Sequence, residues 1–299
     1  MSIICGTDLS LASAAALEVA RALASQRGDR EVVLVHVVDS EPETDAELER
    51  LRARLEAQAR ARGDASRGSP GAEPPGVRSE LIIGPPDETL VGFAETEGSD
   101  LVVIAAQSSR ADDASRLGTT ASQVIARTHV PVIVVRDPAP WLAFARAERP
   151  LKILLGIDDS ATCDLGIQWT LALGKRGPIE VVLGAIYYPD DAAAHYGLHV
   201  RAMVESDPEI ERLMERDLIR RFTGAAAAAA PGLTARARRG LGRIGDHMIE
   251  LARDEKVDAI VVGTGQKTGL GRLGSVSSVI VQDAPQSVVC VPPQAVVVT

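Results

Sequence analysis

Aromatic residues and cysteine are scarce in this sequence. Phe, Trp and Tyr together make up 3% of its 299 residues, so any core must be built mainly from Val, Ile, Leu and Ala. The three cysteines, Cys5, Cys163 and Cys290, lie far apart and lack the paired spacing of a metal site or a disulfide framework. We therefore expect reduced thiols in the core, which is typical of a cytoplasmic protein.

Long apolar runs and an excess of positive charge are also missing. No stretch reaches the about 20 apolar residues of a membrane-spanning helix, and the N-terminus lacks the basic segment and longer apolar stretch of a signal peptide. The formal net charge is −9. This charge argues against a general nucleic-acid or anionic-membrane surface, because phosphate binding needs clustered Lys and Arg. We expect a soluble protein that binds neither.

What the sequence does contain is an internal repeat. Three segments of the first half recur in the second: 2–24 at 152–173, 81–106 at 239–264, and 129–138 at 284–293. The first correspondence brings Asp8 and Asp158 into register. A chain of this length commonly forms two domains. We predict domains at 1–140 and 150–299, with the proline-bracketed segment 137–150 as a linker.

Each half alternates short apolar runs with amphipathic helical patterns. Runs such as VVLVHVV and LVVIAA are continuous rather than alternating, as expected for strands buried on both faces. Strand and helix in alternation indicate βαβ units with right-handed crossovers. The predicted fold is therefore α/β, with a doubly wound parallel sheet in each half.

The strand ends hold the residues that could bind a ligand, because open α/β sheets bind ligands at the carboxyl ends of their strands. In the second half, GTGQKTGLGRLGSVSSVI at 263–280 contains Lys267 and Arg272 before Gly274 and Ser275 open a helix. Free amides at a helix start attract phosphate oxygens, and Ser275 could cap the helix. The alternative is a plain turn and cap with two solvated cations.

These segments resemble the universal stress protein family. Its nucleotide-binding members carry Gly, two residues, Gly, nine residues, then Gly and Ser or Thr, after an Asp-containing first turn. The resemblance covers nearly the whole chain in two copies. Its segments are GTDLS at 6–10, VHVV at 35–38, GSDLVVIA at 98–105 and PVIVV at 131–135, then IDDS at 157–160, VDAIVVGTG at 257–265 and LGSVSSVI at 273–280.

The resemblance implies two tandem Rossmann-like domains of the adenine nucleotide alpha-hydrolase-like kind, related by a pseudo-twofold axis, with final strands 130–135 and 287–291 meeting at their edges. It places Asp8 and Asp158 beside the adenine or ribose, with Val37 and Ile186 lining the base pocket. The phosphate loops would use Gly118 and Thr119 in the first half, and Gly263, Gly265, Lys267, Gly274 and Ser275 in the second.

Both loops depart from the family pattern. In the first half Ala105 and Ser108 replace the early glycines, and Asp112 and Asp113 add negative charge. In the second half Gln266 replaces the second glycine and the loop is two residues shorter. Because the second loop carries two cations instead of an Asp pair, we predict that the second half is the better nucleotide site.

Other motifs are weaker. GLGRIG at 240–245 matches the dinucleotide fingerprint, but the preceding TARARR is too basic for a buried first strand. His195 and His199 could start a metal site if they shared a helix face, but no third ligand is spaced to join them. His36 lies in an apolar strand, as a hydrogen-bonded core histidine would. We predict no metal site.

The leading hypothesis is a stress-response regulator in which ATP, or a related adenine nucleotide, biases conformation or the choice of an unidentified regulatory partner. We expect no dedicated catalysis, at most weak ATP hydrolysis, and Mg²⁺ only together with the nucleotide. The resemblance also implies a possible homodimer through the family's strand edges. The alternative is a scaffold of the same fold that no longer binds nucleotide. An adenylating or pyrophosphatase-type enzyme has no residue set to support it.

Overall fold

The computed structural model describes residues 2–61, 75–107, 117–158, 160–199, 206–226, 232–265 and 273–295. The first half contains β1 (Ile3–Gly6), α1 (Leu11–Arg27), β2 (Glu31–Val38), α2 (Asp45–Arg60), β3 (Gly76–Ile83), α3 (Pro86–Thr96), β4 (Leu101–Ala105), α4 (Thr119–Arg127) and β5 (Val132–Val135). The second contains β6 (Leu151–Gly156), α6 (Ala161–Gly174), β7 (Ile179–Tyr187), α7 (Pro189–Tyr196), α8 (Pro208–Ala226), β8 (Thr234–Arg239), α9 (Ile244–Asp254), β9 (Ala259–Gly263), α10 (Ser275–Asp283) and β10 (Ser287–Val291). Helix α5 (Ala139–Ala145) joins the halves.

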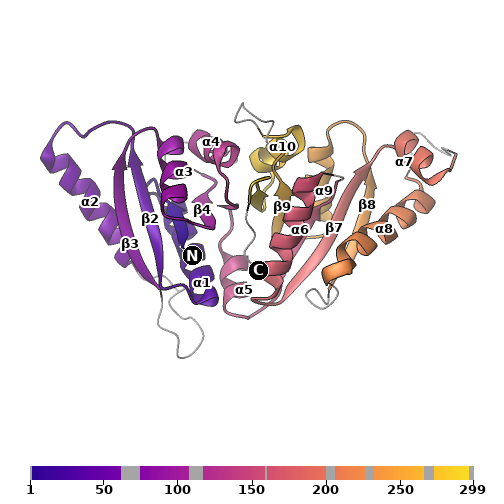
Figure 1. Ribbon diagram of the computed structural model, residues 1–299, viewed down its shortest axis with the longest axis horizontal. Helices are drawn as coiled ribbons and strands as arrows, with labels where there is room; N and C mark the ends of the chain where they lie inside the picture. The colour runs from indigo at the N-terminus through magenta and orange to yellow at the C-terminus, as the bar shows by residue number, and fades with distance from the viewer. Residues whose placement is uncertain are drawn as a thin grey trace.

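All these strands belong to one sheet that runs through both halves (Figure 1). The strand order is β3-β2-β1-β4-β5-β10-β9-β6-β7-β8. Strands within each half are parallel, whereas β5 and β10 pair antiparallel, with Val134 opposite Val288 and Val132 opposite Cys290. The α/β prediction, the parallel sheets and the meeting of the two final strands are confirmed.

Apolar side chains fill both faces of the sheet. Ile3 and Cys5 point into one core together with α1, α2, α6 and α8, while Ile4 between them points into the other with α3, α4, α9 and α10. This alternation is what a strand covered on both faces requires. The three cysteines are buried and unpaired, as predicted, and burial raises the pKa of the Cys5 thiol to about 12.

The segment between the halves differs from the predicted linker. It forms α5, whose Trp141 and Phe144 are 0% exposed and pack in the core that α1 and β6 share. Proline is tolerated in the first turn of a helix because the amide it removes would have no helical partner there. Pro140 therefore begins a buried helix where the sequence suggested only a break.

Gly84, in the turn between β3 and α3, offers a stability test. Its φ is 149°, and a Cβ there would lie 2.5 Å from Thr89 Oγ1. Gly84→Ala is expected to lower the free energy of unfolding by about 1–3 kcal/mol, measured by urea denaturation. Gly92→Ala is the matched control, because Gly92 lies in helix α3 with nothing within 4 Å of its Cβ position, and it should be neutral or stabilising. Equal losses would contradict the argument.

Candidate functional site

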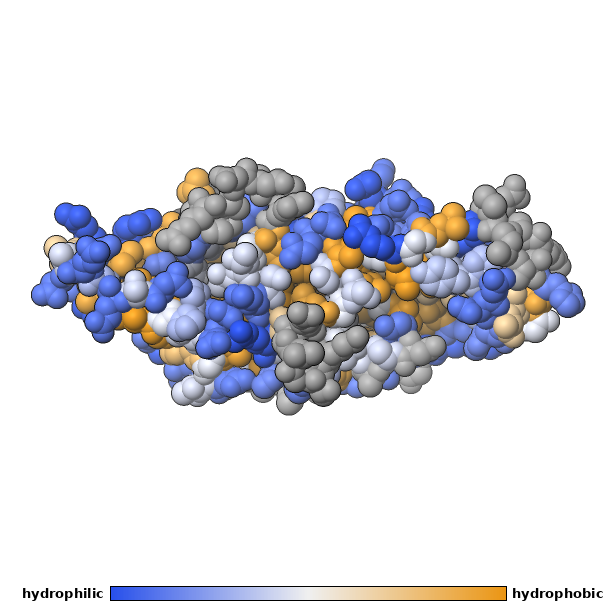
Figure 2. Space-filling model, turned by 90° about the horizontal axis from the view of Figure 1, so that it is seen from above, coloured by the Kyte–Doolittle hydropathy of each residue, from blue (hydrophilic) through white to orange (hydrophobic). Residues whose placement is uncertain are grey.

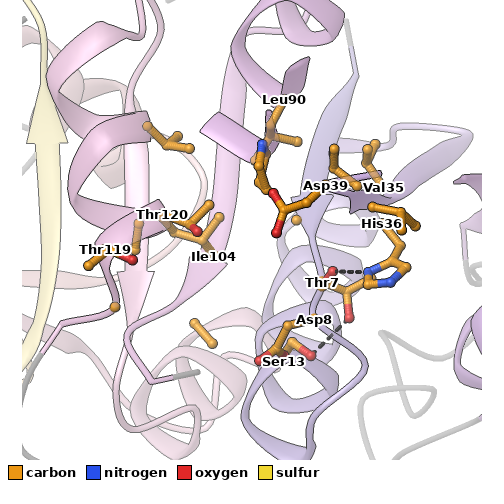
Figure 3. A pocket seen from close by; sticks show the side chains of 18 of the residues that line it. Thr7, Asp8, Ser13, Val35, His36, Asp39, Leu90, Ile104, Thr119 and Thr120 are labelled. Atoms are coloured by element: carbon orange, nitrogen blue, oxygen red, sulfur yellow. Dashed lines mark hydrogen bonds between the residues drawn. The ribbon is translucent and has the colours of Figure 1, made fainter. Parts of the chain in front are cut away.

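A cavity of about 510 Å³ opens at the carboxyl ends of the strands in the first half. The chain crosses from one side of the sheet to the other between β1 and β4, which are neighbours although five elements of the fold separate them in sequence. Such switch points are where doubly wound sheets bind ligands. The cavity is lined by the ends of β1, β2 and β4 and by parts of α2, α3 and α4 (Figure 3).

The cavity floor is apolar. Val35, Leu90, Ile104 and Val124 line it and are each at most 6% exposed. Gly6 also lines it, and a Cβ there would lie 2.9 Å from Leu90 Cδ2 and 3.1 Å from Ile104 Cγ2. The floor is therefore closely packed. The volume of the whole cavity, about 510 Å³, falls within the range of small-molecule sites.

Asp8 stands at the cavity on a turn held by several hydrogen bonds. Its Oδ1 accepts from the Ser10 amide at 3.1 Å, and Ser10 caps α1. Thr7 Oγ1 accepts from the Leu9 amide at 2.9 Å and donates to Gln58 Oε1 on α2 at 2.8 Å. Helix α2 therefore fixes the turn that carries Asp8, and the predicted place of Asp8 at the strand-end crevice agrees with this geometry.

His36 is hydrogen-bonded, as predicted, but it also lines the cavity. Its Nδ1 lies 2.7 Å from the Thr7 carbonyl oxygen, and because a carbonyl oxygen can only accept, Nδ1 is the donor of this hydrogen bond. Sequence reasoning assigned Val37 to the cavity, where it does lie, and missed Asp39, Glu47 and Thr120, which also line it. Asp39 lies just after β2, and Glu47 and Thr120 lie in the first turns of α2 and α4. These positions were the sequence signal by which the three residues could have been found.

Helix α4 begins at the cavity without a side-chain cap. Its N-cap is Gly118, to which no described side chain supplies a capping hydrogen bond, and Thr119 is the first helical residue. The Gly118 amide donates to the Ala106 carbonyl oxygen at 3.0 Å, which ties the helix start to the end of β4. The first-turn amides therefore face the cavity rim with the positive end of the helix dipole.

The second half repeats this helix start in α10. Gly274 is the N-cap, again without a described capping side chain, and Ser275 is the first helical residue. The prediction that Ser275 caps the helix is therefore wrong, because the cap position falls one residue earlier and Ser277 Oγ donates to the Gly274 carbonyl oxygen instead. Lys267, predicted to contact phosphate, lies outside the described residues.

The Asp turn of the second half is held differently. Asp158 is exposed and its Oδ1 accepts from the Ser160 amide at 2.9 Å, while its carbonyl oxygen accepts from Arg221 on α8 at 2.6 Å. Thr162 packs on Gly263, where a Cβ would lie 2.8 Å from Thr162 Oγ1.

The remaining predicted residues of the second half lie around these strand ends. Ile186, near the end of β7, packs on Gly240, since its Cγ2 lies 2.8 Å from the Cβ position there. Gly265 is exposed after β9. Figure 2 looks onto this edge of the molecule and shows apolar residues exposed between hydrophilic ones.

The weaker motifs take structural places. The segment 240–245 follows β8, the last strand of the sheet, and not a central one. Helix α7 ends at Tyr196 with Gly197 in the left-handed conformation, so His199 lies beyond the helix that holds His195. No group of three potential metal ligands occurs among the described residues. None of the described helices is long and apolar enough to cross a bilayer.

Fold and crevice together define a tandem Rossmann-like α/β protein with a ligand cavity at a strand switch point. The model of the universal stress protein family matches residues 1–136 and 151–292, and the chain belongs to that family. A universal stress protein of Archaeoglobus fulgidus has a similar structure, with a TM-score of 0.62 at 16% identity over 98% of both chains. A putative universal stress protein of Pseudomonas aeruginosa gives a TM-score of 0.60 at 15% identity, covering 98% of this chain and 93% of that one.

A curated relative supports the same family. A universal stress protein of Methanocaldococcus jannaschii is 34% identical over 62 residues, which is 21% of this chain. The match spans 36% of that relative's length.

Proposed function

We propose that this protein binds an adenine nucleotide in the cavity of its first half, as a stress-response regulator without dedicated catalysis. The observation that carries the proposal is the cavity itself, which lies between the Asp8 turn and the start of α4, where no described side chain caps the helix. This departs from the sequence-based preference for the second half, whose phosphate loop lies largely outside the described residues.

The three parts of the cavity suit three parts of a nucleotide. The buried floor around Val35 and Ile104 offers an apolar surface for a base. The Asp8 carboxylate can accept hydrogen bonds from ribose hydroxyls. The amides at Thr119 and Thr120 can donate to a phosphate, and the helix dipole adds to that attraction.

The cavity supports binding better than turnover. Cleavage of a phosphate or acyl bond by a protein side chain needs a nucleophile hydrogen-bonded to a base. His36 Nδ1 donates to the Thr7 carbonyl oxygen, and no described hydroxyl group is hydrogen-bonded to the His36 ring. Any Mg²⁺ would arrive with the nucleotide, since the described side chains offer no cluster for it.

Two further parts of the proposal concern organisation. We place the domains at 1–140 and 150–299, with α5 packed between them, and the protein in the cytoplasm. A homodimer would need a surface other than the β5 and β10 edges, because these edges pair with each other within the chain. A scaffold that no longer binds nucleotide is the competing function, favoured by Ala105 at the position of the first family glycine.

A matched pair of variants tests which half binds. Thr119→Glu places a carboxylate at the first residue of α4, where it should stabilise the helix but repel a phosphate. We expect AMP affinity, measured by calorimetry, to fall by about tenfold. Ser275→Glu makes the same change in α10 and should leave the affinity unchanged. The reverse pattern would assign binding to the second half, and no binding of AMP, ADP, ATP or adenosine would favour the scaffold.

A further inference from the structure

We infer that the cavity of the first half selects adenine ligands of low charge, adenosine or a nucleotide with a single phosphate, over ADP and ATP. The inference rests on the proposed function, since it takes an adenine ligand as given. It concerns how many phosphates the rim of the cavity accepts.

Three carboxylates line the cavity, each from a different element. Asp8 follows β1, Asp39 follows β2, and Glu47 lies in the first turn of α2. In Figure 3 the Asp39 carboxylate lies between the α4 threonines and the pair formed by Thr7 and His36. Negative charge therefore faces the cavity from the β2 side at Asp39 and from the start of α2 at Glu47, whose Oε2 accepts from the Glu43 amide at 3.3 Å.

The helix start of α4 supplies the attraction for phosphate at this rim. Its dipole is equivalent to about half a positive charge, and the first-turn amides around Thr119 and Thr120 can satisfy the oxygens of one phosphate. The charged side chains among the described lining residues are the three carboxylates, with no Lys or Arg. A single phosphate can be held by α4, whereas each further phosphate adds charge that these carboxylates repel.

The exposure of the Asp39 and Glu47 carboxylates sets how strongly they repel additional phosphates. Asp39 and Glu47 are exposed at the cavity mouth, so water and salt screen their repulsion. The floor, in contrast, is buried and apolar and makes no distinction between adenosine and ATP. Selectivity should therefore lie in the charge of the ligand's tail, and it should weaken as the salt concentration rises.

Calorimetric titration of the full chain with adenosine, AMP, ADP and ATP tests the inference. In low salt with EDTA, we expect adenosine and AMP to bind about tenfold tighter than ATP, with the ratio shrinking at high salt. ATP binding as tightly as adenosine, with or without Mg²⁺, would overturn the inference and leave the proposed function intact. If none of the four ligands binds, the proposed function itself fails.

Variants that remove one negative charge test which carboxylates cause the preference for adenosine over ATP. Asp39→Asn and Glu47→Gln should each raise ATP affinity about threefold while adenosine affinity stays the same. Glu49→Gln is the matched control, because Glu49 lies on the same helix as Glu47 with a side chain 68% exposed and outside the cavity lining. A gain in adenosine affinity, or an ATP gain equal to that of Glu49→Gln, would show that these carboxylates do not set the selectivity.

Discussion

Replacing Trp141 by Ala is expected to lower the free energy of unfolding by about 3–5 kcal/mol. Trp141 is 0% exposed and lies in the core formed by α1, α5 and the strands of both halves. Its neighbour on α5, Phe144, is also 0% exposed and already packed in this core, and close-packed side chains relax only in part to refill a cavity. Urea denaturation followed by circular dichroism gives the value.

Trp141→Phe separates packing from polarity in the same place. The Trp141 Nε1 atom is buried and has no hydrogen-bond partner among the described residues, which costs free energy in the folded state. Phe keeps most of the apolar volume and removes this group, so we expect a loss of less than about 1.5 kcal/mol. Trp169 remains as the fluorescent reporter. Equal losses for Ala and Phe would contradict the packing argument.

The repeat made most of the fold predictable. Runs such as VVLVHVV, buried on both faces, indicate parallel strands on their own, and the second copy repeats the alternation of strand and helix, with two helices, α7 and α8, where the first half has α2 alone. The meeting of β5 and β10 followed from the family resemblance and not from the residues. Helix α5 could not be predicted, because prolines that end most helices are compatible with the first turn of one.

The candidate site was predictable only in part. Asp8 stood out because it follows the first strand of the repeat, whereas Val37 was assigned through the family resemblance alone, and both line the cavity. Asp39 follows β2 and Glu47 lies in the first turn of α2, but acidic residues in such places are usually solvated, so position alone did not single them out. The packing of α2 against β3, the strand next to β2, brings them to the same rim. The cap of α10 was misplaced by one residue because Gly and Ser are both accepted at that position.

The repeat of 81–106 at 239–264 also brings Asp100 and Asp258 into register, and the ion pairs at these two aspartates lead to the second large effect. Arg27, at the end of α1, lies 2.9 Å from Asp29 and 2.7 Å from Asp100, and all three side chains are at most 15% exposed. Arg27→Ala removes the one cation in contact with both nearly buried carboxylates among the described residues, and leaves Asp29 with the weaker attraction of Arg176 and the N-terminus. We expect the free energy of unfolding to fall by about 3–5 kcal/mol at pH 7, measured by urea denaturation.

The loss should depend on pH. Burial raises the pKa of Asp29, and Asp100 adds to the rise while Arg27 opposes it. When the pKa of a carboxyl group is higher in the folded state than in the unfolded state, the free energy of unfolding falls as the pH rises from the unfolded-state pKa through the folded-state pKa. Removing Arg27 raises the pKa further, so the variant's deficit should be largest at neutral pH and shrink as the pH falls toward 4 and Asp29 is protonated.

Arg149→Ala supplies the comparison in the second half. Arg149 pairs with Asp258, the repeat partner of Asp100, at 2.7 Å, but its side chain is 45% exposed. Water can replace the exposed guanidinium, so we expect a loss of at most about 1 kcal/mol with little change between pH 7 and pH 4. Asp258 is 14% exposed and Asp100 15%, so the two sites differ mainly in the exposure of the arginine. A similar loss at both sites, or a deficit of Arg27→Ala that does not shrink in acid, would show that burial of the arginine does not cause the difference. Asp100 and Asp258 occupy the same place in the two copies of the fold. Because Arg27 is buried and Arg149 is exposed, the two substitutions should change the free energy of unfolding by different amounts.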